Sequence, residues 1–318
     1  MKRLYLGVDG GQSSTTALIG DDAGRVLGTG SAGPCNHVGA SEGREKLIRA
    51  IRECVSRAFE QARMEQIARP RFEAACFGMS GGPADKRLIL SEILETPLLT
   101  VTTDAAIALA GAIAGKPGII TIAGTGSIAY GRNADGRTAR VGGWGYVFGD
   151  EGGAFDIARQ ALRAALRHEE GWGPQTALHP MLLTATGAAD ANDLLHRFYT
   201  SEYSRPRIAA FSRLVDEAAV NGDWAASGIL QAAAQQLAAL SASVRMQLWR
   251  PGGPVPIAYI GGVFRSTIVR ERFRALTELE EGNHCGPPVF GPAAGALLQA
   301  YQAAGLDPVL KNVPEFKE

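Results

Sequence analysis

The pattern of apolar and polar positions predicts that one kind of structure occurs twice in the chain. Residues 4–16 and residues 119–131 each begin with a continuous apolar run, break at glycine and hydroxyl residues, and then resume as a second apolar run. An apolar run of this kind is typical of a buried strand, and the interruption predicts a turn. Exposed backbone N–H groups in such a turn can bind phosphate, helped by side-chain hydroxyls. The hypothesis is two phosphate-binding turns that face each other across a cleft; the alternative is a pair of ordinary hairpins.

The elements around these two stretches also follow one order. In the first half, the pattern predicts strands at 4–9, 15–20, 25–31, 72–79 and 98–102, and helices at 42–64, 85–95 and 105–114. The second half restarts with strands at 119–123, 128–132 and 137–141, then helices from 153 to about 250, a strand at 255–260 and helices at 266–277 and 293–304. A strand meander followed by alternating helices and strands, present twice, predicts two similar α/β domains.

The length of the chain supports this division. At 318 residues it exceeds the ~250–300 residues at which single hydrophobic cores stop growing. We expect an N-terminal domain at residues 1–115 and a C-terminal domain at residues 116–318, with a helical insert at about 153–250. We leave open whether the last helix returns to the N-terminal domain.

Composition narrows the class of protein. The net charge is zero and 46% of residues are hydrophobic, which suits a soluble globular enzyme and gives no sign of a nucleic-acid or membrane partner. There is no signal-peptide layout and no apolar run of ~18 residues. The four cysteines lie far apart without a C-x-x-C pair, which argues against structural zinc and a disulfide scaffold, and we expect a cytoplasmic setting.

The common nucleotide-binding signatures fit poorly. No G-x-x-x-x-G-K-[ST] sequence is present, so a P-loop is unsupported. Residues 124–129 satisfy the loose G-x-G-x-x-A pattern after a strand, but a dinucleotide site needs a helix next. Residues 128–130 are instead typical of a strand, which disfavours a dinucleotide site.

Two aspartates follow predicted strands. Asp9 stands beside the first glycine turn, where a carboxylate suits a hydrated Mg²⁺ between it and a phosphate; the alternative is a turn aspartate that caps its own backbone. Asp104 stands at the carboxyl end of a strand and opens a helix, where ligands usually bind. It could accept the proton of a substrate hydroxyl during phosphoryl transfer, or it could merely favour the helix dipole.

Two glycine-rich stretches are candidate ligand loops. Residues 142–153, GGWGYVFGDEGG, are poor packing material but suit a loop that closes on a polar ligand. Trp144 could offer its face to a sugar ring or belong to the core, and Asp150 or Glu151 could bind sugar hydroxyls. Residues 261–265, GGVFR, would permit close approach of a flat base, or simply make room for a helix to begin.

Together these residues resemble the sugar-kinase branch of the actin/Hsp70/hexokinase superfamily, and within it the BadF/BadG/BcrA/BcrD ATPase family with its N-acetylglucosamine kinases. The loop GGWGYVFGDEGG is the most specific part of the resemblance, which runs nearly end to end. It implies two ribonuclease-H-like domains around a nucleotide and sugar cleft, usually in a homodimer. It also implies ATP as the phosphoryl donor, with Mg²⁺ near Asp9 through water.

The resemblance implies roles for particular residues. Asp104 matches the catalytic base. Positions that contact the sugar match Asn36, Asp104, Ser127, Gly143, Trp144, Gly145 and Asp150. Positions that bind ATP match Gly10, Gly11, Gln12, Ser13, Thr15, Gly124, Thr125, Gly126, Ala209, Gly261, Gly262, Val263, Phe264 and Arg265. Gln12, Ser13 and Gly153 depart from the usual residues, which questions affinity more than activity.

The activity that the resemblance implies is ATP-dependent phosphorylation of N-acetylglucosamine to its 6-phosphate. Glucosamine, N-acetylmuramic acid and glucose remain alternative substrates. An ATPase that drives a partner protein is a further alternative, although such family members hold an iron–sulfur cluster through paired cysteines that this chain lacks. A sugar-sensing regulator without catalysis is a third alternative, disfavoured by Asp9 and Asp104.

Overall fold

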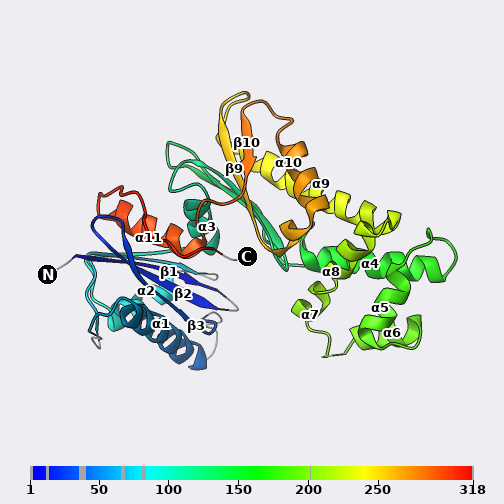
Figure 1. The fold of residues 1–318 in the computed structure, drawn as a ribbon, viewed down its shortest axis with the longest axis horizontal. Helices are drawn as coiled ribbons and strands as arrows, with labels where there is room; N and C mark the ends of the chain where they lie inside the picture. Colours follow the sequence, from blue (N-terminus) through cyan, green and yellow to red (C-terminus); the bar gives the residue numbers. More distant parts are fainter. Residues whose placement is uncertain are drawn as a thin grey trace. The chain divides into compact units, whose positions relative to one another are not determined.

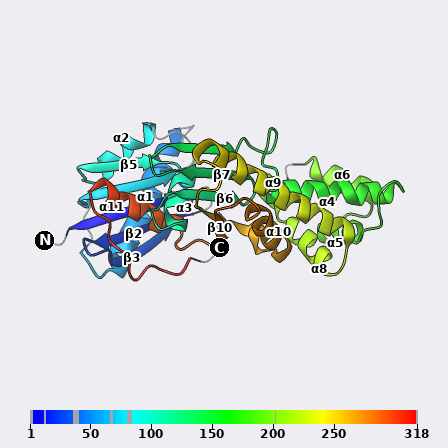
Figure 2. The same cartoon turned by 90° about the horizontal axis from the view of Figure 1, so that it is seen from above.

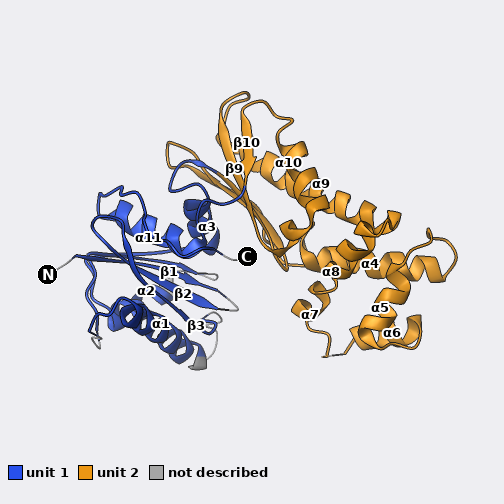
Figure 3. Ribbon diagram, in the orientation of Figure 1, with its two compact units in different colours: residues 1–118, 287–317 blue, residues 119–286, 318 orange. Residues whose placement is uncertain are grey.

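The computed structural model describes residues 3–11, 14–35, 41–65, 69–79, 84–200 and 202–316. The chain divides into two compact units. Unit 1 comprises residues 1–118 and 287–317, and unit 2 comprises residues 119–286 and 318 (Figure 3).

The core of unit 1 is a five-stranded mixed sheet with the strand order β3-β2-β1-β4-β5. Its strands are β1 (Leu4–Gly10), β2 (Thr15–Asp21), β3 (Val26–Ala32), β4 (Ala74–Met79) and β5 (Leu98–Thr102). The first three form an antiparallel meander, and β4 and β5 run parallel to β1. The carboxyl ends of β1, β4 and β5 therefore lie at one edge of the sheet, where Asp9 stands opposite Gly78.

Helices cover both faces of this sheet (Figure 1). On one face, α1 (Ser41–Gln61) and α2 (Ala84–Ile93) form a core with buried strand residues such as Leu6 and Phe77. On the other face, α3 (Asp104–Ala112) and α11 (Pro292–Ala303) form a second core. The small residues of α11 permit close packing, since a Cβ on Gly295 would lie 1.9 Å from the carbonyl oxygen of Ile107. The last helix of the chain thus packs in unit 1, far from its neighbours in sequence.

The sheet of unit 2 repeats the same arrangement, with the strand order β10-β9-β6-β7-β8. Its strands are β6 (Gly118–Ala123), β7 (Ser127–Arg132), β8 (Thr138–Gly142), β9 (Val255–Ile260) and β10 (Asn283–Gly286). In both units the first strand is central, the meander extends to one side, and the later strands pair in parallel on the other. The expected α/β class with two ribonuclease-H-like domains is confirmed.

Most of unit 2 outside its sheet is helical. The elements between β8 and β9 are α4 (Ala154–Glu169), α5 (Leu178–Thr186), α6 (Ala191–Phe198), α7 (Arg205–Ala209), α8 (Ser212–Val220) and α9 (Trp224–Leu248). Between β9 and β10 come a short 3₁₀ helix, η1 (Gly262–Arg265), and α10 (Thr267–Thr277), which runs beside α9 (Figure 2). Asp190 and Asp223 accept backbone N–H groups at the starts of α6 and α9. One continuous core joins these helices to the sheet.

The apolar pattern missed one strand and misplaced some ends. Strand β10 was not predicted, because it carries no apolar run. Only Cys285 is buried among its four residues. The helix expected at 105–114 begins one residue earlier, with Thr103 as its N-cap. Among the residues that the structure describes, no helix combines the length and apolar character needed to cross a membrane.

Candidate active site

The turn after β1 has a tightly fixed backbone. The N–H of Gly11 donates to the carbonyl of Ser14 over 2.9 Å, and the buried Thr15 hydroxyl donates to the carbonyl of Gly33 over 2.8 Å. Thr15 therefore holds the turn together from inside and presents no hydroxyl to solvent. The predicted ATP contacts Gln12 and Ser13, and the predicted sugar contact Asn36, lie outside the described residues.

Two carboxylates, Asp9 and Asp104, lie at this edge of the unit 1 sheet. Burial, and secondarily the negative charge of Asp104, raise the pKa of Asp9 to about 7. Asp104 itself is exposed, and its Oδ1 accepts the N–H of Ala105 over 2.8 Å. The helix is capped by Thr103, whose hydroxyl accepts the N–H of Ala106 over 3.2 Å. Asp104 is thus not the N-cap of α3, and its second carboxylate oxygen is available for other chemistry.

Sequence reasoning missed a buried cation in the same region. Lys86, in the first turn of α2, is 4% exposed. Burial lowers its pKa, an effect that the charges of Cys35 and Asp104 oppose. A single lysine in a helix carries no sequence signal for such a position, because the packing of α2 against the sheet is what buries it.

The residues near Asp9 fit a hydrated Mg²⁺. Within the described ranges there is no group of three or more His, Cys, Asp or Glu side chains that could hold a metal ion directly. Mg²⁺ keeps several waters and takes few protein carboxylates, so a buried carboxylate whose charge is poorly compensated suits it. Asp9, with its raised pKa, is such a carboxylate.

The second predicted turn, after β6, is held by the first residues of α4 and by the loop before it. The N–H groups of Ala154 and Phe155 donate to the carbonyls of Gly124 and Thr125 over 2.8 and 3.1 Å. The buried Ser127 hydroxyl donates to the carbonyl of Glu151 over 2.6 Å, so it holds the loop. A strand, β7, follows this turn where a dinucleotide site would need a helix.

The glycine-rich loop at residues 142–153 exposes its aromatic side chains. Trp144 is 69% exposed, with the Arg140 guanidinium carbon 4.9 Å from its ring centroid, so the alternative of a core tryptophan is wrong. Gly143 and Gly145 have φ values of +71° and +84°, which glycine adopts without strain. The loop therefore presents an accessible aromatic face on a backbone shaped by glycine.

Asp150 occupies a different environment in the same loop. It is 5% exposed, has a φ of +65°, and forms an ion pair with Arg205. The sequence placed Asp150 among the sugar contacts but gave no sign of this partner, because Arg205 comes from the helical insert.

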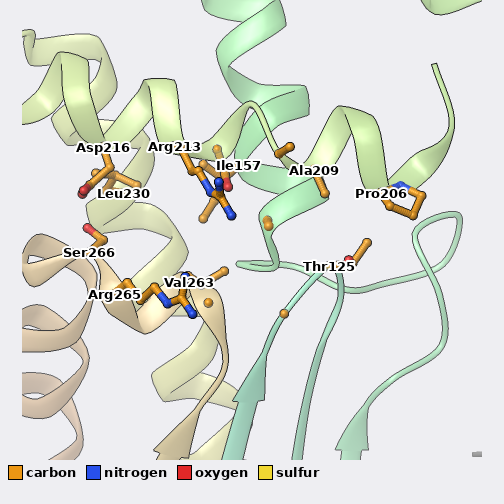
Figure 4. Close-up of a pocket in the computed structure, with 15 residues that line it drawn as sticks. Thr125, Ile157, Pro206, Ala209, Arg213, Asp216, Leu230, Val263, Arg265 and Ser266 are labelled. Carbon is orange, nitrogen blue, oxygen red and sulfur yellow. The ribbon is translucent and has the colours of Figure 1, made fainter. Parts of the chain in front are cut away.

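A pocket of about 560 Å³ opens beside the second turn, entirely within unit 2 (Figure 4). Six of the predicted ATP contacts line it, namely Gly124, Thr125, Ala209, Gly262, Val263 and Arg265. Two others serve packing. Phe264 is 2% exposed and its ring lies 5.0 Å from that of Phe273, and a Cβ on Gly261 would lie 2.4 Å from the Ala123 carbonyl oxygen. For Gly261, room at the start of η1 explains the glycine.

The helical insert supplies lining residues that sequence reasoning missed. These include Pro206, Arg213 and Asp216, which join Ser266 around the pocket. Figure 4 shows Asp216 and Ser266 on the side away from Thr125, with Arg213 and Arg265 extending between. Oδ1 of Asp216 is buried without a hydrogen-bond partner among the described residues. Apolar walls, two arginines and one unsatisfied acceptor suit a flat, anionic ligand with its own N–H or O–H donors.

Known proteins provide an independent comparison. Over 288 residues the chain is 32% identical to the N-acetylmuramic acid/N-acetylglucosamine kinase of Clostridium acetobutylicum, covering 87% of this chain and 91% of that protein. Over 273 residues it is 30% identical to the N-acetyl-D-glucosamine kinase of Dictyostelium discoideum, covering 82% and 85%. A solved structure from Chromobacterium violaceum, provisionally described as an N-acetylglucosamine kinase, matches with a TM-score of 0.74 and 25% identity over 93% of this chain and 98% of that chain.

The family model points the same way and covers most of the protein. Residues 6–300 match the BadF/BadG/BcrA/BcrD ATPase family. The match spans both ribonuclease-H-like units, both glycine turns and the loop at residues 142–153. The chain belongs to the BadF/BadG/BcrA/BcrD ATPase family.

Proposed function

We propose that this protein phosphorylates an amino sugar with ATP, converting N-acetylglucosamine to N-acetylglucosamine 6-phosphate. The observation that carries the proposal is the pocket of about 560 Å³ beside the Gly124–Gly126 turn, whose lining suits an adenine nucleotide. The names of the relatives, which are amino-sugar kinases, supply the substrate class.

In the proposed complex, the base and ribose occupy the pocket and the phosphates extend to the turn. Ala209, Val263 and Gly262 provide an apolar, close-fitting wall for the base. The unsatisfied Oδ1 of Asp216 would accept a hydrogen bond from a donor on the nucleotide. Backbone N–H groups of the turn would face the phosphates, as in other anion-binding turns.

Asp104 is the proposed general base. Its exposed carboxylate, at the first residue of α3, can accept the proton of the attacking sugar hydroxyl. Phosphoryl transfer depends chiefly on positioning and electrostatics, so a correctly placed base and neutralised phosphates account for most of the catalysis. Mg²⁺, when bound near Asp9 through water, would supply charge neutralisation at the phosphates.

The proposed sugar contacts lie on the loop at residues 142–153. The exposed ring of Trp144 can pack on the apolar face of a pyranose, and Gly143 and Gly145 let the backbone approach the hydroxyls. Asn36, Ser127 and Asp150 complete the set of sugar contacts that the family resemblance implies.

The homodimer also stays a prediction, which light scattering would test.

An ATPase that drives a partner protein is the main alternative within the family. A cluster shared between subunits would need accessible cysteine pairs. All four cysteines of this chain are buried, and burial raises the pKa of Cys54, Cys76 and Cys285 to about 12, which makes the thiolate form unfavourable. The cysteines therefore favour the kinase.

The test is ADP release with Mg-ATP in the presence of N-acetylglucosamine, glucosamine, N-acetylmuramic acid, glucose or no sugar. We expect strong stimulation by N-acetylglucosamine and a product phosphorylated at the 6-hydroxyl, identified by NMR. ADP release at one rate in every sample, including the one without sugar, would overturn the kinase and favour the partner-driving ATPase.

A further inference from the structure

Arg205 is a cation at the second glycine turn that neither the motifs nor the family resemblance identified. It is the first residue of α7, the helix that also contributes Pro206 and Ala209 to the pocket lining. Its guanidinium lies beside Gly126, the last glycine of the turn. A Cβ on Gly126 would lie 2.9 Å from Nη2 of Arg205 and 2.3 Å from Oδ2 of Asp150. The ion pair of these two residues therefore rests directly on the turn.

Aromatic rings fix the orientation of this guanidinium. Its central carbon lies 5.1 Å from the ring centroid of Tyr146 and 6.0 Å from that of Phe155. Cation–π contacts of this kind attract a guanidinium to the ring face and restrict its plane. Arg205 is thus contacted by three side chains, those of Tyr146, Phe155 and Asp150, which together orient its guanidinium.

The ion pair leaves much of the donor capacity of Arg205 unused. A guanidinium has five N–H donors, and Asp150 engages it through Nη2. Nε is buried and has no acceptor among the described residues, while 35% of the side chain remains exposed. Asp150 is almost fully buried, so without Arg205 it would leave an uncompensated negative charge at a turn proposed to bind phosphates.

We propose that Arg205 is a phosphate-binding residue of the ATP site, which bridges Asp150 and the terminal phosphates of the nucleotide. In this arrangement Nη2 keeps its bond to Asp150, and the exposed guanidinium N–H groups donate to phosphate oxygens at the Gly124–Gly126 turn. The inference rests on the proposed function, because it takes the pocket beside this turn as the nucleotide site. It adds to that function a side-chain cation from the helical insert, at a turn whose own residues carry no charge.

A purely structural ion pair is the competing explanation. In that case Arg205 would serve only to neutralise Asp150, and any weakening of nucleotide binding on its removal would come from the charge left behind. The two explanations differ in what happens when both partners are removed together, since loss of a direct phosphate contact is not repaired by neutralising Asp150.

The test is calorimetric binding of ADP and of adenosine, without sugar, to the wild type and to Arg205→Met, Arg205→Lys and the double variant Arg205→Met/Asp150→Asn. Arg207→Met is the matched control, because Arg207 lies on the same helix, pairs with Glu202 over 2.9 Å and is 48% exposed. We expect Arg205→Met to weaken ADP binding about tenfold to a hundredfold while adenosine binding stays within about twofold. Arg205→Lys should lose less ADP affinity than Arg205→Met, because lysine keeps the charge but not the planar set of donors. The Arg207→Met control should bind both ligands as the wild type does.

The double variant decides between the explanations. We expect it to bind ADP as weakly as Arg205→Met does. Recovery of wild-type ADP affinity in the double variant, or an equal loss of adenosine and ADP in Arg205→Met, would overturn the phosphate contact. A wild type that binds neither ligand would instead overturn the proposed function, so the two failures are distinguishable. Thermal melting of each variant, together with adenosine binding, checks that the variants are folded.

Discussion

The glycine turns of the two units follow equivalent strands but carry opposite chemistry. In unit 1 the turn after β1 stands near Asp9 and Asp104, and burial, with the negative charge of Asp104 as the smaller cause, raises the pKa of Asp9 to about 7. In unit 2 the turn after β6 carries the Arg205–Asp150 ion pair and opens onto a pocket lined by Arg213 and Arg265. Two carboxylates thus stand near the first turn, with buried Lys86 in the same region, and arginines border the second.

The difference comes from what lies between the strands. In unit 1, β3 ends at Ala32 and α1 begins at Ser41, so little chain is available to surround the turn. In unit 2, helices α4–α9 lie between β8 and β9, and α7 and α8 supply Arg205 and Arg213. The repeated strand order places the two backbones in equivalent positions, and the inserted helices decide which charges meet them.

The acidic turn should carry the proton transfer. Asp104→Asn cannot accept a proton, so turnover with Mg-ATP and N-acetylglucosamine should fall by about 10²- to 10⁴-fold. The KM of the sugar should change far less. Asp135→Asn is the control, since Asp135 is exposed in the turn between β7 and β8, and it should behave as the wild type does. Turnover near the wild-type value in Asp104→Asn would exclude Asp104 as the base.

We expect Asp9 to lower the stability of the metal-free protein and to support Mg²⁺ binding. Its pKa is raised from 3.8 to about 7, so the folded protein pays to ionise it as the pH rises between these values. Asp9→Asn should therefore melt higher than the wild type without metal, by an amount that grows from about pH 4 to pH 7 and then levels off. The same variant should need about 10- to 100-fold more Mg²⁺ for activity, as expected when a carboxylate acts on the metal through water.

Two measurements check this prediction. Scanning fluorimetry of metal-free protein over the pH range gives the stability difference, and the Mg²⁺ dependence of ADP release gives the metal requirement. A melting difference that shrinks as the pH rises would contradict the raised pKa of Asp9.

The cation-bordered turn should be sensitive to small steric changes. A Cβ at Gly126 meets the Arg205–Asp150 pair, whereas a Cβ at Gly124 meets nothing within 4 Å. Gly126→Ala should therefore lower the free energy of unfolding by about 1–3 kcal/mol. Gly124→Ala should change it by less than about 0.5 kcal/mol. Chemical denaturation of both variants measures the difference, and equal stabilities would show that the ion pair does not rest on the turn.

Much of the fold follows from local pattern. Strands such as β5 and β9 agree with the expected ranges residue for residue. A short run of apolar and β-branched residues bounded by turns is typical of a buried strand. Strand β10 did not follow, since it is short and pairs only with β9. Likewise, the pairing of α11 with α3 depends on residues nearly 190 positions apart, beyond any local signal.

The candidate site divides in the same way. The glycine turns, Asp9 and Asp104 could be identified from the sequence, because strand ends and turn residues are neighbours along the chain. Buried Lys86, Asp216 with its unsatisfied oxygen, and Arg205 could not, because their roles depend on partners from distant segments. Helical periodicity shows which face of a helix is buried, but it does not show what that face meets.

The sequence by itself determined the two-fold repeat of strands, the positions of both glycine turns and the class of chemistry that they permit. Only the tertiary structure decided that Trp144 is exposed while Asp150 is buried against Arg205, although both belong to one glycine-rich loop. The physical reason is that hydrogen bonds and apolar runs along the chain fix local conformation. The burial and charge of a side chain are fixed by whatever packs against it, and here that is a helix 55 residues away.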